Sequence, residues 1–150
     1  MYKLWWLTSV ALAGLLASCS RVPYAQRQQQ RQAAYAAAAG PAVRHFHFVT
    51  LYSWEPLGDK QVVIYTRPNE AWLLDLGGGC PELEYTPTIG LTSMFNEVSI
   101  NFDKILIKRG YFPCTITQIR PVDMARLKIE QQAQRKIDNQ PRVQSSPAGA

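Results

Sequence analysis

The sequence predicts a mainly β fold, a small antiparallel sandwich or barrel of about six strands followed by a short C-terminal helix. Short runs of β-branched and aromatic residues recur between Val43 and Ile119, and turn residues separate these runs. From Val122 onward, apolar residues recur at the helical period instead. Short antiparallel strands in such a series typically form a sandwich or a small barrel.

The expected strands are placed by their apolar residues and by the turns between them. They lie at residues 43–52, 61–66, 71–76, 97–102, 104–108 and 114–119. In the first strand Phe46 shares one face with Phe48 and Tyr52, while His45 and His47 lie on the other face. In the fourth strand the alternation places Val98 and Phe102 toward the core.

The β-rich domain is expected at residues 43–128, including the start of the C-terminal helix. Apolar residues then recur on one helical face, at Val122, Ala125, Ile129, Ala133 and Ile137. Because this stripe weakens beyond Ile129, only the first turns are expected to pack. Residues 129–150 are expected to be a frayed helix and a disordered tail.

The first eighteen residues have the layout of a secretory signal peptide. Lys3 supplies a positive charge, and an uncharged apolar run follows from Leu4 to Leu16. A helix of that length spans about 20 Å, short of the roughly 30 Å hydrocarbon core of a bilayer. We therefore expect residues 1–18 to be a signal peptide rather than a stable transmembrane anchor.

The apolar run ends in Leu16-Ala17-Ser18-Cys19, which resembles the lipobox of bacterial lipoproteins. The resemblance implies cleavage before Cys19 and lipidation of its sulfur, and acyl chains of this kind hold a protein on a bilayer. An Asp after the cysteine would resemble an inner-membrane retention signal, so Ser20 implies the outer membrane, with the domain facing the periplasm. The alternative is ordinary cleavage that leaves Cys19 as a free thiol.

Residues 19–42 are expected to form a tether between the membrane and the domain. They are rich in Gln, Arg and Ala, with hardly a large apolar side chain that could face a core. Ala and Gln favour helix, but an isolated helix of this length is marginal in water. An extended tether of this length would reach tens of Å from the membrane.

The chain has three cysteines, of which Cys80 and Cys114 lie in the domain. With Cys19 acylated, these two can pair only with each other, and export brings them into an oxidising compartment. A redox pair or a metal site is the alternative, but no C-x-x-C motif occurs. We expect a structural Cys80–Cys114 disulfide, which a domain with a thin core needs.

The basic composition does not indicate a nucleic-acid-binding domain. The formal net charge is +5, but residues 19–44 carry four arginines and no acidic residue. Residues 45–122 carry six basic and eight acidic residues, a net charge of −2. A nucleic-acid-binding domain needs a basic face, so no nucleic-acid partner is expected. The expected partners are the membrane, through the lipid anchor, and an envelope protein.

His45 and His47 are the candidate metal ligands. Residues two apart on a strand share a face, and two imidazoles at this spacing can chelate a transition metal. The chain has no further histidine, so carboxylates such as Glu55, Asp59 or Glu82 would have to complete the site. Two histidines in an alternating strand are more often a solvated face.

Four segments together resemble a family of small proteobacterial lipoproteins of unknown function. The segments are Thr66–Leu76, Cys80–Tyr85, Thr88–Ser93 and Cys114–Asp123. The resemblance covers residues 43–127 and includes both domain cysteines. It implies export and a compact β-rich domain, and it supplies no activity and no catalytic residue.

These features predict an exported, lipid-anchored envelope lipoprotein whose domain is a non-enzymatic structural or binding module of unknown ligand. No G-x-S-x-G, H-E-x-x-H or phosphate-loop motif occurs, so no catalytic residue and no cofactor is predicted. The alternative is a small periplasmic enzyme or metal-binding protein that uses His45 and His47. A pocket in which His, carboxylate and Ser side chains converge would favour this alternative.

Overall fold

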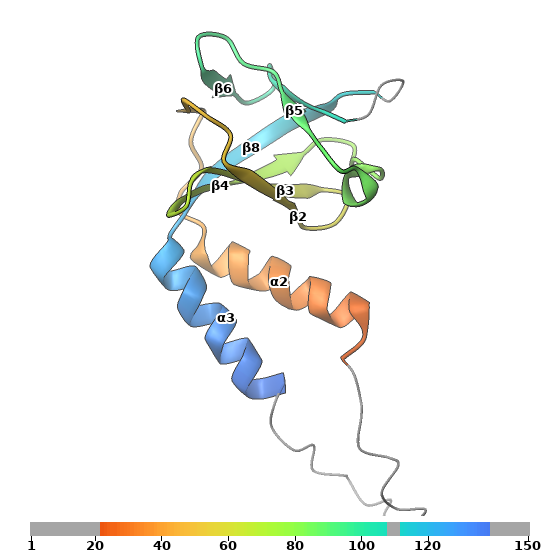
Figure 1. Cartoon of the computed structure of the whole chain (residues 1–150), viewed down its shortest axis with the longest axis vertical. Helices are drawn as coiled ribbons and strands as arrows, with labels where there is room; N and C mark the ends of the chain where they lie inside the picture. The colour runs from red at the N-terminus through yellow and green to blue at the C-terminus, as the bar shows by residue number, and fades with distance from the viewer. Residues whose placement is uncertain (1–21, 108–111, 139–150) are drawn as a thin grey trace, which may run out of the picture.

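The computed structural model describes residues 22–107 and 112–138, and it confirms the mainly β class (Figure 1). Six strands form one curled antiparallel sheet, half of a barrel, in the order β2-β3-β4-β8-β7-β5, and β1 pairs with β6 in a second small sheet. The elements are α2 (Tyr24–Ala38), β1 (His45–His47), β2 (Ser53–Pro56), β3 (Gln61–Arg67), β4 (Glu70–Leu76), the 3₁₀ turn η2 (Leu83–Tyr85), β5 (Gly90–Leu91), β6 (Glu97–Ser99), β7 (Lys104–Leu106), β8 (Cys114–Val122) and α3 (Met124–Asp138).

Some expectations fall on residues that the structure does not describe. The expected signal peptide at residues 1–18 and the expected lipidation site Cys19 lie outside the described residues, as do residues 139–150 of the expected tail. Among the helices that the structure describes, none is both long and apolar enough to cross a membrane.

The central hairpin matches its prediction closely. β3 and β4 pair antiparallel across the turn that contains Pro68 and Asn69, and an ion pair between Arg67 and Glu70, at 3.3 Å, closes it. The last predicted strand is also present and extends to Val122 as β8. The sequence did not indicate β2 or β5, both of which lie outside the six expected strands.

The first and fourth predicted strands are shorter than expected. β1 ends at His47, after which the backbone N–H of Phe48 donates to the carbonyl of Asn96 at 3.0 Å. β6 ends at Ser99 because the buried carboxylate of Asp103 accepts the Ser99 backbone N–H at 2.7 Å. The turn that follows exposes Phe102, so its predicted inward position is wrong.

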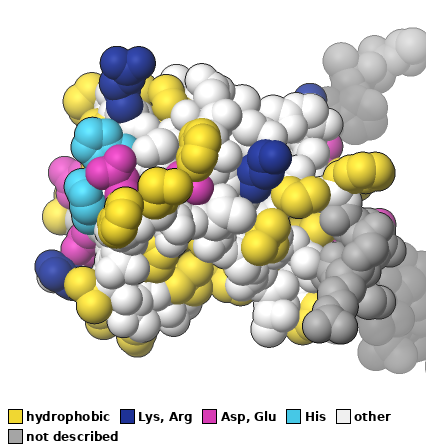
Figure 2. Space-filling view, turned by 90° about the horizontal axis from the view of Figure 1, so that it is seen from above, with side chains coloured by type: hydrophobic (Ala, Val, Ile, Leu, Met, Phe, Trp, Pro, Cys, Tyr) yellow, Lys and Arg dark blue, Asp and Glu magenta, His cyan; other side chains and the backbone are white. Residues whose placement is uncertain are grey.

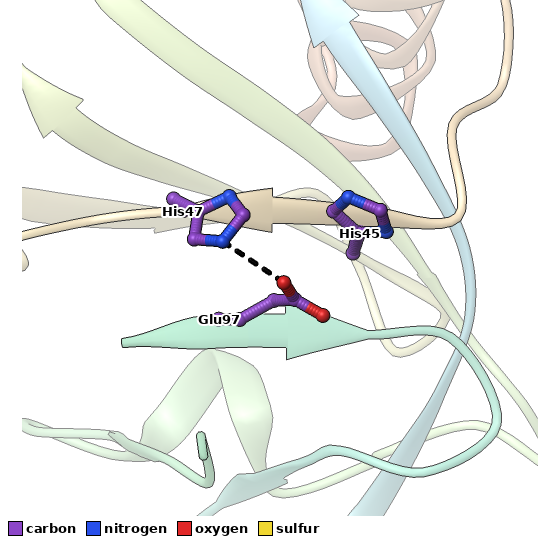
Figure 3. A group of neighbouring side chains, drawn as sticks. All are labelled: His45, His47 and Glu97. Carbon is purple, nitrogen blue, oxygen red and sulfur yellow. Dashed lines mark ion pairs between the residues drawn. The ribbon is translucent and has the colours of Figure 1, made fainter. Parts of the chain in front are cut away.

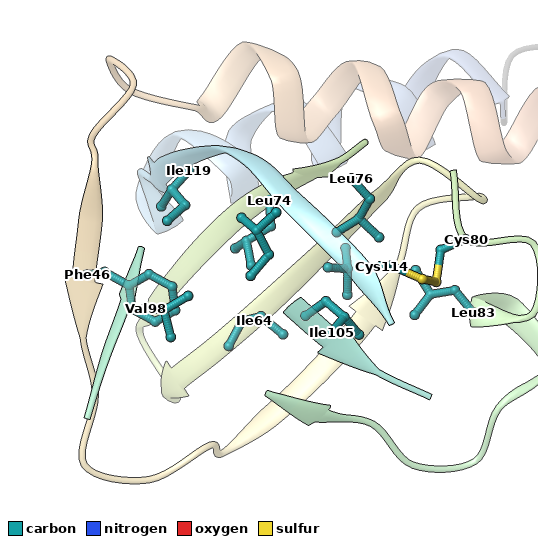
Figure 4. Close-up of a cluster of buried hydrophobic side chains, with 12 residues drawn as sticks. Phe46, Ile64, Leu74, Leu76, Cys80, Leu83, Val98, Ile105, Cys114 and Ile119 are labelled. Carbon is teal, nitrogen blue, oxygen red and sulfur yellow. A yellow bond between two sulfur atoms is a disulfide. The ribbon is translucent and has the colours of Figure 1, made fainter. Parts of the chain in front are cut away.

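One apolar core fills the concave side of the curled sheet, beneath the β1–β6 pair (Figure 4). Its buried members are Phe46, Val62, Ile64, Leu74, Leu76, Cys80, Leu83, Val98, Ile105, Cys114, Ile116 and Ile119. The Cys80–Cys114 disulfide lies at one end of this core and confirms the predicted pairing. It joins the segment after β4 to the start of β8, with the two Cα atoms 5.8 Å apart.

The other face of the sheet is covered by α2, so the prediction of a tether is wrong for residues 24–38. Ala34, Tyr35 and Ala38 are buried in a second core formed with the sheet residues Val63 and Leu73. The small side chains of Ala34 and Ala38 lie one helical turn apart and let the helix approach the sheet closely. Packing therefore stabilises a helix that would be marginal alone.

The C-terminal helix is confirmed as α3, but its packed face and its length differ from the prediction. Leu127 is buried in the second core, whereas Ile129 and Ile137 are 64% and 65% exposed. α3 continues to Asp138 because its later turns contact α2: the side-chain amide of Gln134 donates to the Gln30 carbonyl at 2.8 Å. The domain thus extends beyond the expected 43–128 in both directions.

A hydrogen-bonded cluster joins α2 to strands β2 and β3. The hydroxyl of Tyr35 donates to Glu55 at 2.8 Å and lies 2.6 Å from the hydroxyl of Tyr65. Arg31 of α2 forms an ion pair with the same Glu55. Burial raises the pKa of Tyr35, and the bond to Tyr65 and the negative charge of Glu55 raise it further. Burial also raises the pKa of Tyr65.

Removing the disulfide tests its structural role. The sequence separation between Cys80 and Cys114 is 34, and a loop of about this length gives a stabilisation of roughly 3–4 kcal/mol in the chain-entropy model. We expect the double variant Cys80→Ser, Cys114→Ser to lose this amount of unfolding free energy in urea titrations. A thiol assay on unfolded, unreduced protein should detect neither cysteine; two reactive domain thiols would contradict the pairing.

Tyr35→Phe tests the attachment of α2. It removes one of the donors to the Glu55 carboxylate and the partner of the Tyr65 hydroxyl, so we expect a loss of about 1–3 kcal/mol in unfolding free energy. Tyr24→Phe is the matched control, because Tyr24 lies on the same helix, is 62% exposed and donates only a long surface hydrogen bond, of 3.4 Å, to Glu84. That control should stay within about 0.5 kcal/mol of wild type. Equal losses in both variants would contradict the packed helix.

The raised tyrosine pKa values also predict a dependence on alkaline pH. In the folded protein Tyr35 and Tyr65 keep their protons at a pH where the unfolded chain, with tyrosine pKa values near 10, has lost them. Their stabilisation is complete below about pH 10 and is lost as the pH rises further. Urea titrations at neutral and alkaline pH should show that the unfolding free energy of wild type falls more steeply with pH than that of Tyr35→Phe. An equal fall in both proteins would contradict a stabilising role for the protonated Tyr35 hydroxyl.

Candidate functional site

The pairing of β1 with β6 decides which side chains of these strands reach the surface. The strands are antiparallel, with His47 opposite Glu97, Phe46 opposite Val98 and His45 opposite Ser99. Phe46 and Val98 are buried in the first core, and the Phe46 ring stacks on Trp72 with centroids 4.9 Å apart. Because side chains alternate along a strand, His45, His47 and Glu97 must then share the outer face.

The three outward side chains form one compact cluster (Figure 3). The Nε2 atom of His47 lies 2.9 Å from a carboxylate oxygen of Glu97. The rings of His45 and His47 meet edge to face, with centroids 5.6 Å apart. One potential ligand atom from each of the three residues lies within 4.8 Å of the others. We call this group the His–Glu cluster.

A tight turn before β6 brings Glu97 into place. Phe95 and Asn96 both have left-handed backbone angles, with φ of 54° and 60°, and Met94 and Glu97 exchange two backbone hydrogen bonds across them. Such turns match the twist of paired strands. Left-handed φ is costly for a bulky residue such as Phe95, so the surrounding contacts must hold the turn. The Asn96 carbonyl provides one of them by accepting the Phe48 N–H.

The donor set suits a divalent transition metal. Two imidazole nitrogens and one carboxylate oxygen are ligands that zinc, copper, nickel and iron accept, and three protein ligands leave further positions open. The side chains of His47 and Glu97 are 66% and 36% exposed, so an ion can reach them directly. Without a metal, the same contact is a surface His–Glu ion pair, which contributes little to stability.

A hollow of about 550 Å³ begins at His47 and extends away from the cluster. Its lining includes Val49, Thr50, Arg67 and Phe95. Figure 2 shows the two histidine side chains beside acidic ones at the surface, with hydrophobic side chains nearby. The open positions of a metal at this cluster could therefore take a ligand from this side.

The hydrogen bonds of the cluster do not follow the order of a hydrolase triad. A triad needs a histidine between the nucleophile and the carboxylate. Here the hydroxyl of Ser99 donates to Glu97 at 3.2 Å, and Glu97 contacts His47, so the carboxylate is central. The arrangement favours ligand binding over activation of Ser99.

The carboxylates expected to complete a metal site do not do so. Glu55 binds Arg31 and Tyr35 beneath α2, and neither Asp59 nor Glu82 belongs to the His–Glu cluster. The third potential ligand is instead Glu97, which the sequence pattern did not indicate as part of the site. The alternating strand around Val98 indicated that Glu97 points outward, but nothing in the local sequence showed that this strand pairs with His45–His47.

A family model described as a family of unknown function (DUF6491) matches residues 2–138. The matched range contains both strands of the His–Glu cluster and both cysteines of the disulfide. No curated protein and no solved structure shows significant similarity to the chain. The predicted resemblance to a family of unknown function is confirmed to that extent, while its lipoprotein and proteobacterial character stay predictions.

Proposed function

Since the chain belongs to this family of unknown function, we propose a function from its own residues: it is an exported lipoprotein, anchored in the outer membrane and facing the periplasm, whose domain is a non-enzymatic binding module. Two observations support export. The segment before Cys19 resembles a lipobox, and the Cys80–Cys114 disulfide suits an oxidising compartment. The disulfide uses both domain cysteines, which leaves Cys19 as the single cysteine for lipidation.

The position of α2 changes how such an anchor would hold the domain. α2 begins at Tyr24, five residues after Cys19, so the domain would lie close to the bilayer rather than at the end of a long tether. The β1–β6 pair lies at the opposite end of the molecule from the two helices (Figure 1). An anchor at Cys19 would therefore leave the His–Glu cluster on the side away from the membrane.

We propose that the ligand of this module is a divalent transition metal ion bound by His45, His47 and Glu97. The observation that carries this proposal is the meeting of three ligand atoms within 4.8 Å of one another across the paired strands β1 and β6. The strands place these side chains on rigid backbone, which favours a defined geometry over chance proximity of loops. The hollow beside His47 gives the metal's open positions access to a further ligand.

Radioactive palmitate labelling in cells tests the anchor. We expect the wild-type chain to be labelled and Cys19→Ala to be unlabelled, because Cys19 supplies the only thiol left for lipidation. The double variant Cys80→Ser, Cys114→Ser is the matched control and should keep the label if it accumulates. Label on the Cys19→Ala chain, or none on wild type, would contradict lipidation at this residue.

Calorimetric titration with zinc and copper tests the metal site. We expect one ion per chain at micromolar concentration, and affinity at least about tenfold weaker for His47→Ala and Glu97→Gln because each loses one of three ligands. Glu82→Gln, which removes a carboxylate outside the cluster, should bind as wild type does. The chain has two histidines, both in the cluster, so imidazole signals in the copper electron paramagnetic resonance spectrum report on it alone. No heat at micromolar metal would rule out the site.

A further inference from the structure

The two helices run antiparallel and enclose a groove on the surface opposite the His–Glu cluster. The Asp123 backbone N–H donates to the Ala38 carbonyl at 2.9 Å, which brings the start of α3 to the end of α2. Further along, Gln134 donates to the Gln30 carbonyl, and the Gln30 side chain donates to Asp138 at 3.0 Å. The last turns of α3 therefore lie beside the first half of α2, and the groove between them has a volume of about 290 Å³.

This groove is basic. Arg27, Arg31 and Arg135 line it, and Asp138 is the acidic residue among its lining. Arg31 is partly neutralised by Glu55, whereas Arg27 and Arg135 are exposed and form no ion pair with any residue that the structure describes. Lys136 adds a further charge in the last turn of α3. The groove thus presents guanidinium groups, which bind phosphate oxygens in a bidentate manner.

The groove also includes the start of α2, which follows Cys19 closely in the sequence. Cys19 precedes Tyr24, the first residue of α2, by five residues, and a fully extended chain of that length reaches at most about 18 Å. Arg27 lies in the first turn of α2. A lipid on Cys19 would therefore hold this end of the domain near the phospholipid head groups, where basic residues are attracted to anionic lipids.

We propose that the groove between α2 and α3 binds the phosphate groups of anionic phospholipids in the membrane that carries the Cys19 anchor. This inference rests on the proposed lipid anchor. The anchor keeps the domain close to the membrane. Arg27 and Arg135 then bind the head groups, which holds the two helices against the membrane surface and fixes the orientation of the domain. The domain then has a fixed orientation, in which the β1–β6 pair, at the end of the molecule opposite the two helices (Figure 1), faces away from the membrane.

Hydrogen exchange of the full lipidated chain in lipid nanodiscs tests the proposal. Discs of phosphatidylcholine alone are compared with discs that also contain phosphatidylglycerol. We expect slower exchange in the first turns of α2 and the last turns of α3 in the anionic discs, and loss of this protection at high salt. The double variant Arg27→Gln, Arg135→Gln should weaken the docking equilibrium about 30-fold, which corresponds to roughly 1 kcal/mol for each removed charge.

A matched control distinguishes binding in the groove from a general effect of positive charge on the helices. The double variant Arg126→Gln, Lys128→Gln removes the same charge from the first turns of α3, away from the groove, and should keep the protection. Equal exchange rates in both kinds of disc would overturn the proposal. An equal loss of protection in the groove variant and in the control variant would also overturn it. Displacement by inorganic phosphate beyond the effect of sodium chloride at the same ionic strength would assign the groove to free phosphate instead.

The intact mass of the disc-bound protein reports on the anchor separately. A mass without acyl chains would contradict lipidation of Cys19. The groove would then be tested by co-sedimentation of the same chain with phosphatidylglycerol vesicles. Binding that requires Arg27 and Arg135 would still support a lipid-phosphate site, and absence of binding would overturn it.

Discussion

The structure depends on the burial of both faces of the β3–β4 hairpin. Neighbouring residues on a strand point to opposite faces, yet Val62, Val63 and Ile64 are all fully buried. Each face therefore needs its own cover: the β1–β6 pair lies over one face and α2 with α3 over the other. Without α2, Val63 and Leu73 would face water, at a cost of about 1.5–3 kcal/mol for each side chain.

The same constraint produces the candidate site. Phe46 and Val98 point inward to close the first core, so the residues beside them on each strand must point outward. Antiparallel register then places His47 opposite Glu97, and the cluster forms as a consequence of core packing. At the other end of the molecule, the cover that α2 and α3 provide creates the basic groove. Both proposed sites thus depend on how the sheet is covered.

Local patterns were enough to predict the class of fold, the central hairpin and the C-terminal helix, because propensity and turn residues are local signals. The Cys80–Cys114 pair could be predicted by elimination, because only two cysteines remain once Cys19 is assigned to lipidation. The role of α2 was missed since its buried face is mostly alanine, which carries no apolar stripe. The fully apolar runs Val62–Ile64 and Trp72–Leu74 did contain a signal for a second covering layer. Glu97 could not be assigned to the site, because its pairing with β1 joins residues far apart in the sequence.

Anomalous diffraction shows directly whether the His–Glu cluster binds a metal ion. Crystals grown with zinc and measured on both sides of the zinc absorption edge would locate the ion without reference to its ligands. We expect a peak at about 2.0–2.2 Å from a nitrogen of His45, a nitrogen of His47 and an oxygen of Glu97. A peak held by other residues, or none at the cluster while zinc binds elsewhere, would contradict the proposed metal site.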